Sequence, residues 1–98
     1  MTKNINEKLG EKIAKTLVSS LEGQAKICEE SISVLLENNV NDECLEQYKN
    51  KFSKDLKDLS TKYKITLNFI TKETPFENSE EYFKKIEAFN NYKFKINV

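Results

Sequence analysis

Apolar residues recur at alternating intervals of four and three positions through the first third of the chain. They are Ala14, Val18, Leu21, Ala25, Cys28, Ile32 and Leu35. Because an α-helix has about 3.6 residues per turn, this spacing places all of these side chains along one side of a helix. A second row lies beside the first and widens it near the N-terminus: Ile5, Leu9, Ile13 and Leu17. The first forty residues are therefore predicted to form one long amphipathic helix.

The segment from residue 37 to residue 43 predicts a turn between two helices. Asn38 or Asn39 can adopt the left-handed conformation that ends a helix, and Asn41 can cap the next one. The apolar side chains that follow are again three or four positions apart: Leu45, Tyr48, Phe52, Leu56, Leu59 and Tyr63. A connection this short predicts an antiparallel helical hairpin over residues 1–62.

The spacing of apolar residues changes after residue 63. Ile65, Leu67 and Phe69 alternate with Thr66, Asn68 and Ile70, and Tyr92, Phe94, Ile96 and Val98 alternate with polar residues at the other end. Alternation with period two and β-branched or aromatic residues predicts two strands. Between them, residues 78–81 resemble a capping box that opens a short helix bearing Tyr82, Phe83, Ile86 and Phe89.

The predicted fold class is therefore α+β in the order α-α-β-α-β. The chain of 98 residues forms one domain, 1–98, with a helical hairpin over 1–62 and a strand-helix-strand unit over 63–98. The connection between the strands permits either a parallel crossover or an antiparallel pair.

The residues from which active sites are usually built are missing. The chain contains no histidine, and all sixteen of its basic residues are lysine. Cys28 and Cys44 do not form a metal-binding or redox motif, and Cys28 lies in the predicted helix core. The two glycines are too far apart for a phosphate-binding loop. We expect no catalytic residues, no metal, no cofactor and no small-molecule substrate.

The distribution of charge gives only a weak indication of nucleic-acid binding. The net charge is zero, although residues 41–72 carry a local excess of lysine. If the two strands pair with their apolar residues inward, several lysines share the outer, solvent-facing side of the sheet or the neighbouring helix. The candidate phosphate-contacting residues are Lys51, Lys54, Lys64, Lys93 and Lys95. An outer face of this kind is also the ordinary solvated side of a half-exposed sheet.

The N-terminal twelve residues lack an apolar core, and no stretch approaches the roughly 20 apolar residues that span a bilayer. We therefore expect no signal peptide and no membrane association. Two cysteines without a disulfide framework fit a reducing compartment, so a cytoplasmic protein is expected.

The order of two helices followed by a strand, over Asn39–Phe52 and Tyr63–Phe69, resembles the dynein light chains. Those proteins are dimeric hubs that bind extended peptides along a sheet edge. The resemblance is one of architecture and rests on no diagnostic motif. It implies self-association and peptide binding at an exposed strand edge.

These features together favour a non-catalytic protein-interaction module, such as a small regulator, inhibitor or assembly subunit. Two strands alone make a marginal sheet, so we expect a partner strand, a second copy of the chain, or a helical dimer formed through the apolar seam. The seam is equally well explained as the core of the hairpin itself. The candidate protein-binding residues are Ile70, on the outward face of the first strand, and Phe76, in the loop after Pro75.

Overall fold

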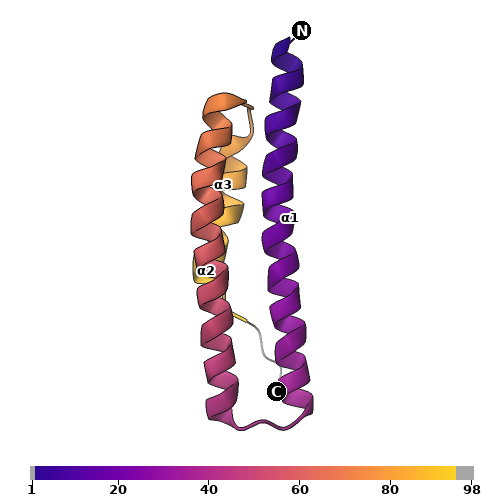
Figure 1. Cartoon of the computed structure of the whole chain (residues 1–98), viewed down its shortest axis with the longest axis vertical. Helices are drawn as coiled ribbons and strands as arrows, with labels where there is room; N and C mark the ends of the chain where they lie inside the picture. Colours follow the sequence, from indigo (N-terminus) through magenta and orange to yellow (C-terminus); the bar gives the residue numbers. More distant parts are fainter. Residues whose placement is uncertain (1, 95–98) are drawn as a thin grey trace.

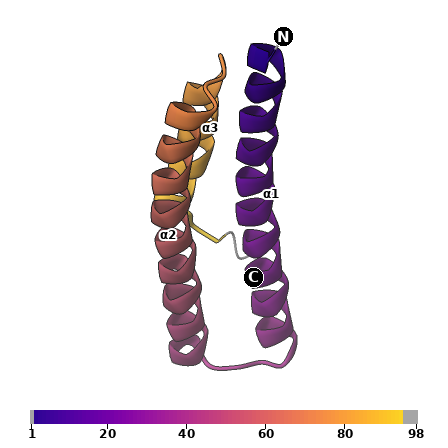
Figure 2. The same cartoon turned by 45° about the horizontal axis from the view of Figure 1, so that its top comes forward.

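Two long antiparallel helices run the length of the molecule, and a short third helix packs on one side of them (Figures 1 and 2). The computed structural model describes residues 2–94. The elements are α1 (Thr2–Glu37), α2 (Asp42–Glu73), α3 (Ser79–Glu87) and a 3₁₀ helix, η1 (Ala88–Asn91). No strand occurs within the described range, so the α+β fold class is wrong, whereas the helical hairpin is present.

The turn between α1 and α2 follows the asparagine pattern of the sequence. Asn39 has a φ of 54°, in the left-handed region, and its N–H donates to the carbonyl of Leu36 at 3.2 Å. The N–H of Val40 donates to the carbonyl of Leu35 at 3.4 Å, which completes a Schellman motif. The side chain of Asn41 then accepts from the N–H of Cys44 at 2.7 Å and caps α2. Residues 38–41 therefore fix the hairpin.

The first predicted strand is the C-terminal part of α2. Tyr63, Leu67 and Ile70 are spaced by four and three positions and continue the core-facing side of the helix, while Ile65 and Phe69 remain 67% and 64% exposed. Residues 65–70 fit both the period of two expected for a strand and the period of three to four expected for a helix. The helix is favoured because each further residue adds one backbone hydrogen bond to a helix that already exists. Packing of Leu67 against α1 outweighs the β-propensity of the segment.

The second predicted strand is wrong where it can be examined. Residues 92–94 extend away from η1 without pairing to another strand, and residues 95–98 lie outside the described residues. Phe94 is 8% exposed and inserts between the long helices. The third helix forms where residues 78–81 predicted it, although the side chain of Asn78 makes no capping hydrogen bond.

The core consists of two clusters along the hairpin, and the apolar seam of α1 supplies both. The upper cluster joins α1, α2 and α3 through Ala14, Val18, Leu21, Leu67, Tyr82 and Ile86. The lower cluster contains Ala25, Cys28, Ile32, Leu56 and Phe94. Small residues of α1 thus face the ring of Phe94. Of the aromatic residues on this part of α2, Tyr48 is 45% exposed and Phe52 is half-buried beside the cluster.

A buried hydrogen bond fixes α3 on the hairpin. The hydroxyl of Ser60 is fully buried and donates to the carbonyl of Ile86 at 2.6 Å. Glu87, the last residue of α3, also pairs with Lys64 at 3.4 Å. Because α3 covers only one side of the hairpin, the opposite side has no helix packed on it among the described residues (Figure 1).

The two glycines of α1 give a test of this packing. A methyl group at Gly10 would overlap the carbonyl oxygen of Thr74, whereas one at Gly23 would meet nothing within 4 Å. We expect Gly23→Ala to stabilise the protein by about 1 kcal/mol through helix propensity. Gly10→Ala should destabilise it by about 1 to 3 kcal/mol, because the loop after α2 must move. Urea unfolding followed by circular dichroism measures both; effects of the same sign would contradict the packing of Thr74 on α1.

Candidate functional site

The two residues expected to bind a protein do not lie on a free surface. Ile70 is 5% exposed and faces the inside of the hairpin, because the segment is helical and not a strand. Phe76 is half-buried, and its ring packs edge-on against Tyr82 with centroids 5.6 Å apart. Both side chains therefore contribute to the interior, and their part in binding a partner stays an untested prediction.

The five candidate lysines do not share one face either. Lys51 pairs with Asp55 at 3.0 Å and Lys64 with Glu87 at 3.4 Å. Lys95 lies outside the described residues. Lys54 and Lys93 do come together, around a hollow of about 430 Å³ between α2 and the segment after η1. Its lining is Ser53, Lys54, Lys57, Asn90, Asn91, Tyr92 and Lys93.

A second hollow lies on the other side of the C-terminal segment. It has a volume of about 510 Å³ and is bordered by Glu22, Glu29, Phe89 and Tyr92. The hydroxyl of Tyr92 donates to a carboxylate oxygen of Glu29 at 3.0 Å. This bond ties the C-terminal segment to α1, as the 3.3 Å bond from Tyr82 to Glu11 ties α3 to it.

Cys28 is a poor nucleophile in this setting. Cys28 is 2% exposed, and burial, with the charges of Asp55 and Glu29 nearby, raises the pKa of its thiol above the ordinary value of 9.0. The reactive thiolate is therefore disfavoured at neutral pH. No cluster of three or more metal-ligating side chains occurs among residues 2–94.

The most unusual surface is a stripe of α1 that carries no charge. Three acids of α1 mark the side that faces α3 and the C-terminal segment: Glu11, Glu22 and Glu29. A residue two positions before or after each acid lies about 160° around the helix from it. These positions, with Thr16 and Val34, form what we call the uncharged stripe: Leu9, Ile13, Thr16, Ser20, Gln24, Ile27, Ser31 and Val34.

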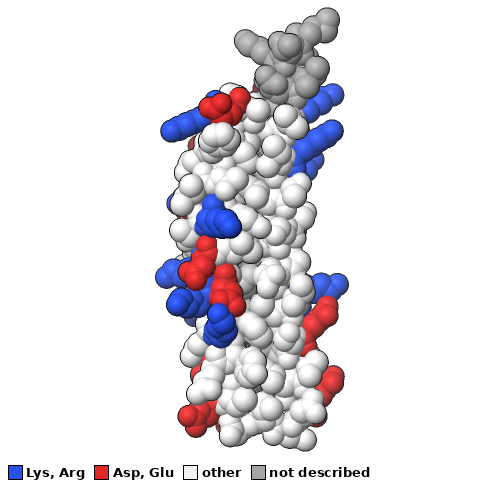
Figure 3. Space-filling model, in the orientation of Figure 1, with Lys and Arg blue, Asp and Glu red and all other residues white. Residues whose placement is uncertain are grey.

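The uncharged stripe is open to solvent although half of its residues are apolar. Ile27 is 59% exposed, Val34 56% and Leu9 48%. All of its members are exposed except Ser31, which is half-buried. In the space-filling view, the face turned away from α3 is mostly uncharged, with charges at its edges and in one row over α2 (Figure 3). One third of the chain is charged, so an uncharged band along a whole exposed helix face departs from ordinary surface composition.

The three hydroxyl groups of the stripe already have hydrogen-bond partners within the chain. The hydroxyl of Thr16 donates to the carbonyl of Lys12 at 3.0 Å, and that of Ser31 to the carbonyl of Ile27 at 2.8 Å. Ser20 and the hydroxyl of Tyr63 are hydrogen-bonded at 2.9 Å. Covering a hydroxyl that already has a partner avoids most of the cost of removing it from water. The stripe can therefore lie against another surface without leaving these groups unpaired.

Comparison with protein families, with curated protein sequences and with solved structures finds no match for this chain. None of the helices in the described part of the chain combines the length and the apolar character needed to cross a membrane. The resemblance to dynein light chains loses its basis, because residues 63–69 belong to α2. What remains is an all-helical hairpin with a free, uncharged helix face.

Tyr82, which is buried, and Tyr92, which is half-buried, predict how stability depends on pH. Burial, with the negative charge and hydrogen bond of Glu11 or Glu29, raises the pKa of Tyr82 and Tyr92 above the ordinary value of 10.0. A pKa raised in the folded state stabilises the fold below pH 10 and is lost as pH rises beyond it. The free energy of unfolding should therefore fall above about pH 10.

Replacing both tyrosines tests this cause. Tyr82→Phe with Tyr92→Phe should cost roughly 1 kcal/mol per hydroxyl at neutral pH and should flatten the alkaline fall. Tyr48→Phe is the control, because Tyr48 is 45% exposed. Unfolding in urea between pH 8 and 11 measures both. A double variant that loses stability as steeply as the wild type would show that other groups cause the fall.

Proposed function

We propose that the protein is a non-catalytic protein-interaction module and that the uncharged stripe of α1 is its docking surface. The observation that carries the proposal is the stripe itself, an exposed band with apolar residues and no charge along α1. Apolar surface of this kind marks interaction sites when it is contiguous. Bonded hydroxyls between the apolar residues further favour a surface that a partner can cover.

The proposed docking surface differs from the two that the sequence suggested, a sheet edge and the apolar seam. A sheet edge is excluded for residues 2–94, since they contain no strand. The apolar seam of α1 is the core of the hairpin, so it is not the docking surface. The uncharged stripe lies beside the seam on the side opposite α3. A small regulator, inhibitor or assembly subunit remains the proposed setting, and two free cysteines support a reducing compartment such as the cytoplasm.

A second candidate function is binding of nucleic-acid phosphates at the hollow between α2 and the C-terminal segment. One observation favours it: Lys54, Lys57 and Lys93 surround the hollow, and none of them takes part in the ion pairs of the described residues. The lining also includes Asn90, whose side-chain oxygen is buried without a hydrogen-bond partner. Zero net charge weighs against this candidate.

Site-specific photo-cross-linking tests the leading proposal. A photoreactive amino acid at position 27 should form adducts with protein in cells that naturally produce the chain, whether the adduct contains a second copy or another protein. Position 84 is the control, because Lys84 is exposed and lies on α3, on the side of the hairpin opposite the stripe. We expect several-fold more adduct from position 27. Equal yields from the two positions would contradict docking on the stripe.

Filter binding to mixed single-stranded RNA and DNA tests the second candidate. If the three lysines contact phosphates, affinity should fall about 10- to 20-fold between 50 and 200 mM salt. Lys54→Glu with Lys93→Glu should abolish binding, and Lys84→Glu on α3 should leave it unchanged. Absence of binding at low salt, or equal effects of the two sets of variants, would remove this candidate.

A further inference from the structure

The uncharged stripe is nearly symmetric about a point between residues 21 and 22. Its members pair across that point to within one position: Leu9 with Val34, Ile13 with Ser31, Thr16 with Ile27 and Ser20 with Gln24. One position corresponds to about 1.5 Å along a helix. A twofold axis through this point, perpendicular to α1, would therefore superpose the stripe on an antiparallel copy of itself.

We infer that the stripe is covered by a second copy of this chain, with α1 antiparallel to α1 of the other copy and the twofold axis near residue 22. The inference rests on the proposed function and names its partner. A twofold dimer requires a surface that is complementary to itself, and the stripe meets that requirement in shape, charge and size.

The paired positions are complementary in size. Ile13 faces Ser31 of the other copy, and Ile27 faces Thr16, so that a large side chain opposes a small one at each place. Alternation of large and small residues lets the ridges of one helix enter the grooves of the other. The outer pair, Leu9 and Val34, is apolar on both sides, and both residues are exposed in the single chain. Covering these residues removes apolar surface from water, which favours association.

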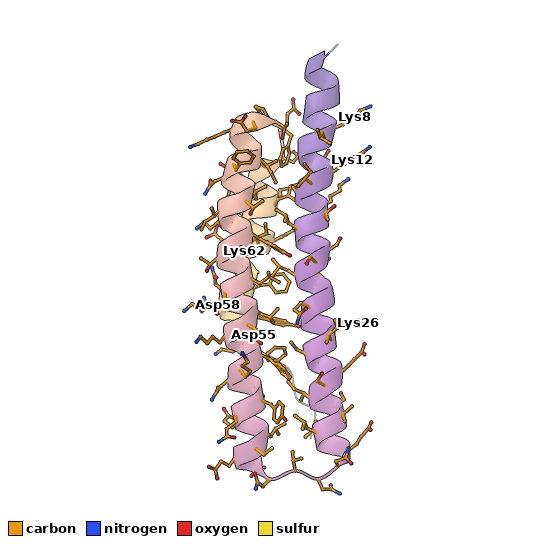
Figure 4. All side chains as sticks on the ribbon, viewed as in Figure 1. Lys8, Lys12, Lys26, Asp55, Asp58 and Lys62 are labelled. Atoms are coloured by element: carbon orange, nitrogen blue, oxygen red, sulfur yellow. The ribbon has the colours of Figure 1, made fainter. Side chains whose placement is uncertain are left out.

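The charges beside the stripe are complementary only in the antiparallel arrangement. Lys8 and Lys12 lie along the outer side of α1 near its N-terminus, and Figure 4 shows both pointing away from α2. Glu30 and Glu37 occupy the same side of the helix near its C-terminus. An antiparallel copy places Lys12 opposite Glu30 and Lys8 opposite Glu37. A parallel copy would leave Lys12 about 27 Å from Glu30 along the helices, so these charges could not pair.

Two charged residues of α2, Asp58 and Lys62, also fit a twofold axis near residue 22. The bond between Ser20 and Tyr63 sets the two helices side by side at that level. Since α2 runs opposite to α1, an axis near residue 22 passes close to residues 60 and 61 of α2. Asp58 and Lys62 flank that point on the face turned toward the viewer (Figure 4). Each would then lie near the opposite charge of the other copy.

The size of the face is sufficient for a stable dimer. The molecule extends 58 Å by 18 Å in the plane of this face. The projected area of roughly 1,000 Å² exceeds the roughly 800 Å² per partner of a standard protein–protein interface. The other side of the hairpin is occupied by α3 and the C-terminal segment, so this face is the broad one left for a second copy.

Charge reversal tests the partner and the direction together. Lys12 and Glu30 are separated by about 27 Å within one helix, so they cannot interact in a single chain. We expect light scattering to show a dimer for the wild type. Lys12→Glu and Glu30→Lys should each weaken it about tenfold, because a favourable pair becomes a repulsive one at two symmetric places. The variant carrying both changes should recover the wild-type dissociation constant within about threefold.

Mixing gives an independent readout. Lys12→Glu chains mixed with Glu30→Lys chains place opposite charges at both contacts, so the mixture should form a heterodimer more tightly than either variant alone. Lys84→Glu, on α3, is the control and should leave the dimer unchanged. Circular dichroism verifies that each variant folds. A dimer whose weakening is not rescued in the doubly changed chain would overturn the antiparallel arrangement.

The experiments distinguish a failure of the dimer from a failure of the proposed function. A wild-type chain that stays monomeric at millimolar concentration would overturn self-association. If position 27 then still cross-links to a different protein, the interaction module stands with another partner. If position 27 also forms no more adduct than position 84, both proposals fall.

Discussion

The buried seam of α1 is the constraint on which the rest of the structure depends. It is the one surface that α2, α3 and the C-terminal segment all contact. Ala14 and Ala25 keep the seam narrow, so that Tyr82 and Phe94 can enter beside α2 without pushing the long helices apart. Because α3 and the C-terminal segment take the same side of the hairpin, the other side is left without a covering helix among the described residues. The free face therefore follows from how the core is filled.

The hairpin could be predicted from the sequence because its signals are local and agree with one another. Heptad spacing defined the seam, and asparagines at 39 and 41 defined the turn. The structure of residues 63–98 could not be predicted correctly, because the apolar residues of 65–70 fit a strand period of two and a helix period of three to four equally well. What decides between the two periods is whether Leu67 can pack against α1, which depends on the register of the hairpin and not on the segment alone. Ser60 added to the ambiguity, since its polar side chain occupies a buried position whose partner, Ile86, lies on α3.

The candidate site was missed for a related reason. Ile70 was expected on the outward face of a strand and Phe76 in an exposed loop, but Ile70 is buried on α2 and Phe76 packs from the loop against Tyr82. The better signal was the distribution of charge in α1. Leu9 and Ile13 were interpreted as a widening of the core, yet the positions that continue their side of the helix carry no charge as far as Val34. A band that stays free of charge from Leu9 to Val34 while its apolar residues remain exposed is more than a broader core, and it is the basis for proposing this surface as a docking site.

The mixed composition of the uncharged stripe also sets the kind of association it suits. An exposed helix face made only of leucine and isoleucine would aggregate, whereas Thr16, Ser20 and Ser31 keep this one compatible with water. Their hydroxyls are bonded within the chain, so a partner gains little hydrogen bonding from them and forfeits little by covering them. In the proposed dimer, the free energy of association would come chiefly from the few apolar residues, and the antiparallel orientation from the lysines and glutamates beside them. Such a division favours a complex that is specific in orientation and moderate in strength, which is what a reversible interaction module requires.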